Sequence, residues 1–439
     1  MPAHLRKFLV QVGETFWLVP AFLTLLGIFG AVGLVHLDRI GAVPQWLIDG
    51  EWVYNGGGTG ARTLLGAVAA STIGVAGTVF SITIAALSLA AGQMGPRLLR
   101  NFTRDRGVQL SLGAFLGTFS YALMVLRSVR MQEEGAFTPH LSLTVGILLA
   151  FACVGTLIYF VDHMSNRINV DTVIELVSDD VRRAIQRLGV DEASPAPPAP
   201  SFWKEAVPIV DRRRGYLQEL DANGLADWAA ENDTAIRLLV RPGDYIFPGT
   251  PSALVLSPAV GAEAAIRGAM ALGATRVSSA DLEFAVRQLV EVAVRALSPG
   301  INDPHTAIGV LDRLGASLCD VASVFLPGGV HLRQGRTVLV TPSIDYGGLC
   351  DAMFFMIRQS VAGNPAVLIR MLEVLTAVAS CERDAGRLAE LRRHADLVLT
   401  DAVREVGSAS DLADVRRRHG AFERTARAEP AATGDAEAA

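Results

Sequence analysis

Hydrophobic residues are distributed very unevenly along the chain. Four stretches carry no charged residue and are each about 20 residues long or longer: Phe16–Val35, Leu64–Ala91, Val108–Leu126 and Leu141–Val161. A helix needs about 20 apolar residues to cross roughly 30 Å of hydrocarbon, so residues 1–165 are predicted to form a membrane domain of about four helices. A signal peptide has a shorter apolar core that ends in a small-residue cleavage site. The first stretch is therefore interpreted as a retained helix.

The rest of the chain mixes charged and apolar residues like an ordinary globular protein. A helical apolar stripe predicts a connecting helix over 166–190, and the proline-rich sequence after it predicts an extended linker over 191–205. A small β-rich unit is expected over 206–258, with strands near 207–210, 215–220, 235–240, 244–247 and 252–256. Residues 259–427 have a mainly helical period with one strand at Thr337–Val340, and the tail 428–439 has the composition of a disordered segment. The predicted fold class is an α-helical membrane domain followed by a mixed α+β soluble domain with a helical C-terminal part.

The positive charges between the spans predict an orientation. Cytoplasmic loops are enriched in Lys and Arg. One set of loops holds nine such residues: Arg6, Lys7, Arg97, Arg100, Arg104, Arg106, Arg167, Arg182 and Arg183; the other holds four: Arg39, Arg62, Arg127 and Arg130. We therefore expect a multi-pass protein of the cell inner membrane, with both termini and the soluble domain in the cytoplasm.

The second span has one face built of small or hydroxyl side chains. Reading three and four residues apart gives Ser71, Gly74, Thr78, Ser81, Ala85, Ser88 and Gly92. Small residues let helices approach closely and hydroxyls bond between them, so one interpretation is helix packing. The other is a pore lining around the axis of an oligomer, because four spans are few to enclose a pathway alone. In the third span, Gly113 and Gly117 form a GxxxG pattern that suits close packing.

Charged residues are absent from all four spans, whereas coupled transporters usually keep ionisable groups at membrane depth. The pattern thus disfavours a coupled transporter. Arg97, Arg100 and Arg104 share a helical face and have two interpretations: contact with anionic headgroups or simple topological charge. The net charge of −5 and the scattered arginines do not indicate nucleic-acid binding. Four cysteines without a CxxC pair predict no disulfide framework and no zinc site, and no cofactor is expected.

The densest polar loop runs from Leu297 to Ala307 and contains Ser298, Asn302, Asp303 and His305. A structural interpretation is a Pro-Gly turn followed by a helix cap, with Pro304 at the first helical position. A functional interpretation is a polar ligand site at a helix N-terminus. Since no nucleophile–base pair or other catalytic spacing stands out, an enzyme is the least supported class.

Two segments, GQMGPRLLRNFTRDRG at Gly92–Gly107 and RALSPGINDPHTA at Arg295–Ala307, resemble a family of bacterial predicted membrane proteins known as a domain of unknown function. The resemblance implies a helical membrane region followed by a soluble region, and implies no activity. The leading hypothesis is an oligomeric channel or passive transport protein with a cytoplasmic regulatory domain, for an unidentified ion or small ligand. The alternative is a membrane-anchored sensor or scaffold.

Overall fold

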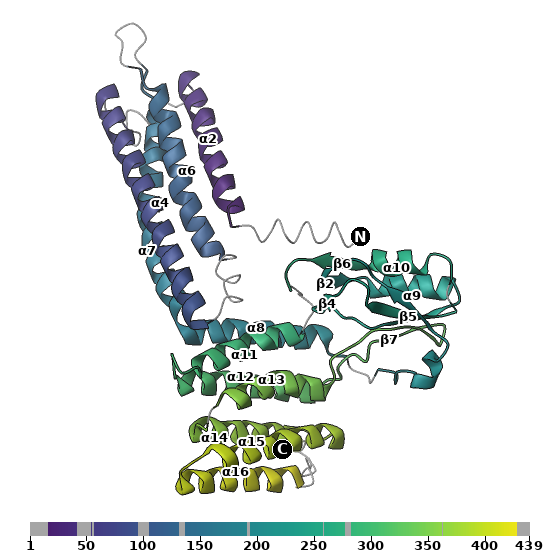
Figure 1. The fold of residues 1–439 in the computed structure, drawn as a ribbon. Coiled ribbons are helices and arrows are strands. Elements are labelled where there is room, and N and C mark those ends of the chain that lie inside the picture. The colour runs from purple at the N-terminus through teal and green to yellow at the C-terminus, as the bar shows by residue number, and fades with distance from the viewer. Residues whose placement is uncertain are drawn as a thin grey trace, which may run out of the picture. The chain divides into compact units, whose positions relative to one another are not determined.

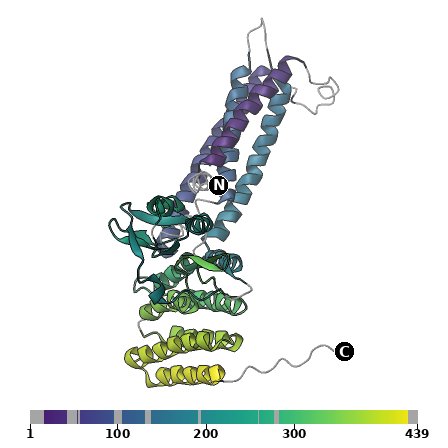
Figure 2. The same cartoon turned by 90° about the vertical axis from the view of Figure 1, so that its right-hand side faces the viewer.

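The computed structural model describes residues 16–41, 54, 57–94, 105–130, 137–190, 194–257, 259–276, 282–361 and 363–427. The chain divides into two compact units, the first ending at Thr172 and the second beginning at Val173. Figures 1 and 2 show the elements of both.

The first unit is a bundle of four long helices, which lie side by side in both views (Figures 1 and 2). They are α2 (Leu18–Arg39), α4 (Gly58–Met94), α6 (Arg106–Ser128) and α7 (His140–Ile168). All four are long and apolar enough to cross a membrane. Helix α6 contacts each of the other three, and 61% of its span is buried against 17–22% for the others. It is therefore the central helix of the bundle.

Glycines bring α2 and α6 into close contact. A Cβ added at Gly117 would lie 2.8 Å from the carbonyl oxygen of Leu23, and one added at Gly27 would collide with the Gly117 carbonyl. The GxxxG pattern of α6 is thus used for packing within the chain. The outward faces of α2 and α7 carry large exposed hydrophobic side chains, as expected of surfaces that meet lipid; they include Phe22, Phe29, Leu148, Phe151 and Ile158.

The amphipathic helix α8 (Val170–Leu188) contributes all but its first three residues to the second unit, which continues into two small sheets. Its first elements are η2 (Pro200–Trp203), β1 (Val207–Val210), β2 (Gly215–Leu220), α9 (Ala222–Glu231), β3 (Ala235–Leu238), β4 (Tyr245–Ile246), β5 (Pro251–Leu256), α10 (Ala262–Ala269) and β6 (Met270–Gly273). Later in the chain come β7 (Val330–Arg333) and β8 (Arg336–Val340). One sheet has the order β1-β5-β3-β8-β7 and the other β4-β2-β6.

Two strands occur where the sequence predicts a helical period. Strand β6 pairs antiparallel with β2, and β7 pairs antiparallel with β8. Strand β6 forms because the distant strand β2 offers an edge, and β7 forms because it makes a hairpin with the neighbouring strand β8. Only the β3–β8 pair is parallel among the strands described, and it joins residues about 100 positions apart. Helix α9 also lies inside the unit expected to be β-rich.

The remaining helices stack in layers within the second unit (Figures 1 and 2). They are α11 (Leu282–Ala296), α12 (Pro304–Ala322), α13 (Tyr346–Ser360), α14 (Pro365–Cys381), α15 (Ala385–Glu405) and α16 (Ala409–Arg427). Four of them start at a side chain that accepts backbone N–H bonds: Asp303, Asp345, Asn364 and Asp384. The predicted fold class, four apolar helices followed by a mixed α+β part and a helical C-terminal part, is confirmed.

Candidate functional site

Helix α4 buries one side and exposes the other. Its buried residues are spaced by three, four or seven positions, which keeps them on one side of the helix: Leu65, Ala69, Thr72, Ala76, Val79 and Ala86. The small and hydroxyl residues singled out from the sequence, Ser71, Gly74, Thr78, Ser81 and Ser88, are all exposed. At 100° per residue the two sets lie on opposite sides of the helix. Among the residues that the structure describes, the other three long helices of the first unit therefore leave this small-residue face uncovered.

The chemistry of this face is polar but locally satisfied. Thr78 Oγ1 donates to the Gly74 carbonyl at 3.2 Å and Ser81 Oγ donates to the Gly77 carbonyl at 2.9 Å. A hydroxyl oxygen that donates its hydrogen still has lone pairs with which to accept, so each remains able to contact water or a neighbouring donor. Exposed Phe80 and Ile84 lie beside the face on one flank. The result is a narrow strip of small groups between larger apolar ones.

The loop before α12 is organised around a helix cap. The Asp303 carboxylate accepts from the Thr306 backbone N–H at 3.2 Å and from Thr306 Oγ1 at 2.6 Å. These bonds, chiefly the one from the Thr306 hydroxyl, hold the pKa of Asp303 below its usual range. Ser298 Oγ donates to the Arg295 carbonyl at 2.6 Å. Both polar side chains are thereby engaged in ending one helix and starting the next.

The other two candidates in that loop have different surroundings. Asn302 adopts a positive φ of 50°, a conformation that Asn tolerates better than most residues, and its backbone N–H bonds the Ser298 carbonyl. The side chains of Asn302 and His305 are exposed. The geometry therefore supports the helix-cap interpretation directly. For the ligand interpretation, only the exposed side chains of Asn302 and His305 remain as candidates. The basic residues Arg97, Arg100 and Arg104 lie outside the described residues.

A buried polar cluster joins the start of α6 to the end of α7, and sequence reasoning missed it. Asp105 caps α6, accepting from the Gly107 N–H at 2.8 Å, and its side chain is only 3% exposed. His163 Nε2 lies 2.8 Å from Asp105 Oδ1, and Arg167 Nε lies 2.9 Å from Oδ2. Tyr159 stacks on the His163 ring with centroids 5.3 Å apart.

This Asp105 cluster has a clear structural use. A buried carboxylate is costly unless it is paired and hydrogen-bonded, and here one imidazole, one guanidinium and the helix N-terminus all compensate it. A Cβ at Gly107 would come within 2.7 Å of both His163 Nε2 and the Tyr159 hydroxyl, so a larger residue there would displace these side chains from the cluster. The only sequence signal was the one-turn spacing of His163 and Arg167, just beyond the uncharged span.

Four helices that could span a membrane, followed by a mixed α+β unit, are the arrangement expected of a membrane protein with a large second unit. Comparison with known proteins agrees. The family described as "Predicted membrane protein (DUF2254)" matches residues 13–377, and the chain belongs to this family, as the two sequence segments indicated.

Relatives in Mycobacterium tuberculosis and Mycobacterium bovis, each named an uncharacterized protein, are 32% identical to this chain over 421 residues. The similarity covers 91% of this chain and 78% of each relative. No solved structure matches the chain significantly.

Proposed function

We propose that this protein is a homo-oligomer in which the small-residue faces of α4 from several copies meet around a passive pathway for ions or small solutes. The observation that carries the proposal is the position of that face, which points away from the chain's own bundle. A fold that leaves such a face open needs something to cover it.

Comparison with the other outward faces supports a protein or water neighbour over lipid. Outward positions of α2 and α7 carry Phe22, Phe29 and Phe151, whereas one strip of α4 is built of Gly74, Ser81 and other small groups, with larger apolar side chains only beside it. Small residues are enriched where transmembrane helices approach each other. Hydroxyl oxygens along the same strip are the polar groups that a passing solute would meet. The absence of ionisable side chains from the predicted strip favours passive movement over ion-coupled transport.

We further propose that the protein lies in the cell inner membrane with its second unit in the cytoplasm, because the loops on that side carry the larger share of Lys and Arg. Reporter fusions test this directly. Fusions after Gly107 and after Leu188 should both report a cytoplasmic position, and a fusion after Gly58 a periplasmic one. A periplasmic result at Leu188 would reverse the proposed orientation.

Flux in liposomes tests the pathway. Thr78→Val and Ser81→Ala each remove a hydroxyl from the exposed face without adding bulk, and both should alter ion flux without changing assembly. Thr72→Val is the matched control, since Thr72 is buried on the opposite side of α4 and bonds the Val68 carbonyl at 2.7 Å. It should leave flux unchanged.

If the unmodified protein conducts nothing, or if all three variants behave alike, the small-residue face of α4 serves only for helix packing. The alternative function, a membrane-anchored sensor or scaffold whose second unit binds a ligand or partner, would then be favoured.

A further inference from the structure

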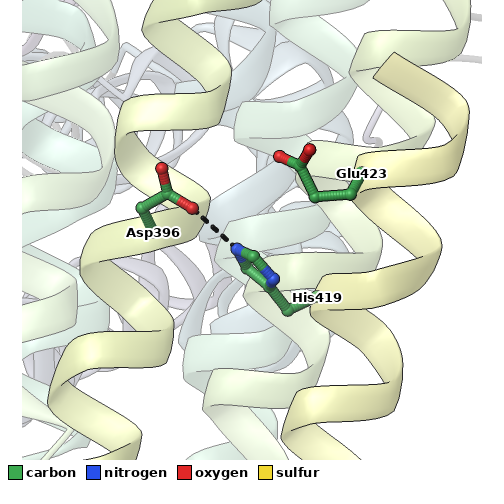
Figure 3. Close-up of side chains that lie close together, drawn as sticks. All are labelled: Asp396, His419 and Glu423. Carbon is green, nitrogen blue, oxygen red and sulfur yellow. Dashed lines mark hydrogen bonds and ion pairs between the residues drawn. The ribbon is translucent and has the colours of Figure 1, made fainter. Parts of the chain in front are cut away.

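The last two helices bring together three side chains that commonly bind metal ions. Asp396 lies on α15, and His419 and Glu423 lie one turn apart on α16. Residues four apart share a helix face, and α15 packs against α16, so all three side chains meet in the seam between the helices (Figure 3). Both helices lie beyond residues 13–377, the part of the chain that matches the family.

The distances suit a small cation. One ligand atom from each residue lies within 4.8 Å of the other two, and His419 Nε2 is 2.8 Å from Asp396 Oδ1. Zinc bonds to nitrogen and oxygen of about 2.0–2.2 Å in a tetrahedron place ligand atoms roughly 3.3 Å apart. An ion that replaced the shared hydrogen would therefore need the His419–Asp396 pair to open by about half an ångström and Glu423 to move closer, both of which are side-chain rotations.

The surroundings orient the ligands and also limit affinity. Glu423 Oε1 accepts from Arg392 Nε at 2.9 Å, and Oε2 accepts from Arg427 Nη2 at 3.0 Å. Burial alone would raise the pKa of Glu423, but these two arginines outweigh it and hold the pKa below its usual range. Each carboxylate oxygen keeps a second lone pair for an ion. However, the positive charges of Arg392 and Arg427 offset the negative charges of Asp396 and Glu423, so a metal ion should bind more weakly here than at a structural zinc site.

We propose that Asp396, His419 and Glu423 form a binding site for a divalent transition-metal ion of the zinc type, which links α15 to α16. An imidazole ligand favours zinc, nickel, cobalt or copper, whereas magnesium and calcium prefer oxygen ligands alone. The Asp396 side chain is 57% exposed, so the remaining position is open to water. Sequence inspection predicts no metal site here because Asp396 comes from a different helix than the HxxxE pair.

The experiment is a calorimetric titration of the full-length protein in detergent with ZnCl₂, after removal of any histidine tag. One zinc ion per chain should bind, and His419→Gln and Asp396→Asn should each weaken that binding by at least about tenfold, since even changes to supporting residues cost 10–100-fold at metal sites. Zinc should also raise the unfolding temperature of the wild type more than that of His419→Gln. His36→Gln removes an exposed histidine of α2, far along the chain from this site, and should bind like the wild type.

A charge test separates this site from other zinc-binding surfaces. Arg427 is 76% exposed at the end of α16, so Arg427→Gln should leave the fold intact while removing a repelling charge. It should tighten zinc binding severalfold. Equal affinity in the wild type and in His419→Gln, no binding by the folded wild type, or no gain in Arg427→Gln would each overturn the assignment.

Discussion

Gly74 and Gly117 are both glycines of apolar helices, and the structure predicts opposite consequences for enlarging them. No atom of the described chain lies within 4 Å of a Cβ placed at Gly74, whereas a Cβ at Gly117 would lie 2.8 Å from the Leu23 carbonyl oxygen. Gly74→Leu should therefore leave the fold of a single chain intact, within about 0.5 kcal/mol as for most surface changes. Gly117→Ala should destabilise the chain itself by about 1–3 kcal/mol, the usual cost of overpacking.

Assembly should respond in the reverse way. If α4 faces meet in an oligomer, a leucine at Gly74 overpacks each contact by about 1–3 kcal/mol, which corresponds to a roughly 5–150-fold weaker association. Light scattering after size-exclusion chromatography in detergent measures the oligomer, and thermal unfolding measures the single chain. An unchanged oligomer in Gly74→Leu, or a loss of thermal stability equal to that of Gly117→Ala, would refute the reasoning.

Three further predictions concern the second unit. Asp401→Asn leaves the buried Arg358 guanidinium without its carboxylate and should lower the free energy of unfolding by about 3–5 kcal/mol. Arg404 is the exposed partner of the same carboxylate, so Arg404→Gln should have little effect, and chemical denaturation compares the two variants. Asp303→Ala should cost about 0.5–2 kcal/mol as a lost cap and Asp303→Ser should recover most of it, so a stable Asp303→Ser variant that had lost flux would instead favour a ligand site. Burial, followed by the nearby Arg393 charge, lowers the pKa of His394 from 6.5 to about 4. The unfolded chain then takes up a proton at pH 5 that the folded chain does not, so about 2 kcal/mol of stability should be lost between pH 7 and pH 5. His394→Gln should remove that loss, and an identical pH dependence in the variant would contradict it.

The class of protein and much of the local structure follow from local patterns in the amino-acid sequence. Uncharged runs such as Leu141–Val161 predict spanning helices because hydrocarbon excludes charge, and this is a property of composition that needs no partner. Strands β1 and β2 occupy the residues their local pattern predicts. The start of α12 is equally local, since Asp303 and Pro304 make a cap and a first turn by themselves.

Which side chains meet depends on how the elements pack against one another. The pattern of α4 marks Ser71, Gly74 and Thr78 as one face, but whether that face packs inside the bundle depends on where α6 and α7 dock, and they cover the opposite side. Strand β6 forms because the distant edge of β2 is available to pair, and β7 forms because it makes a hairpin with β8, the next strand along the chain. The Asp105 cluster and the Asp396–His419–Glu423 site each combine residues from two helices. Local periodicity depends on neighbours three or four residues apart, whereas these contacts arise from packing between elements, which no single stretch of sequence encodes.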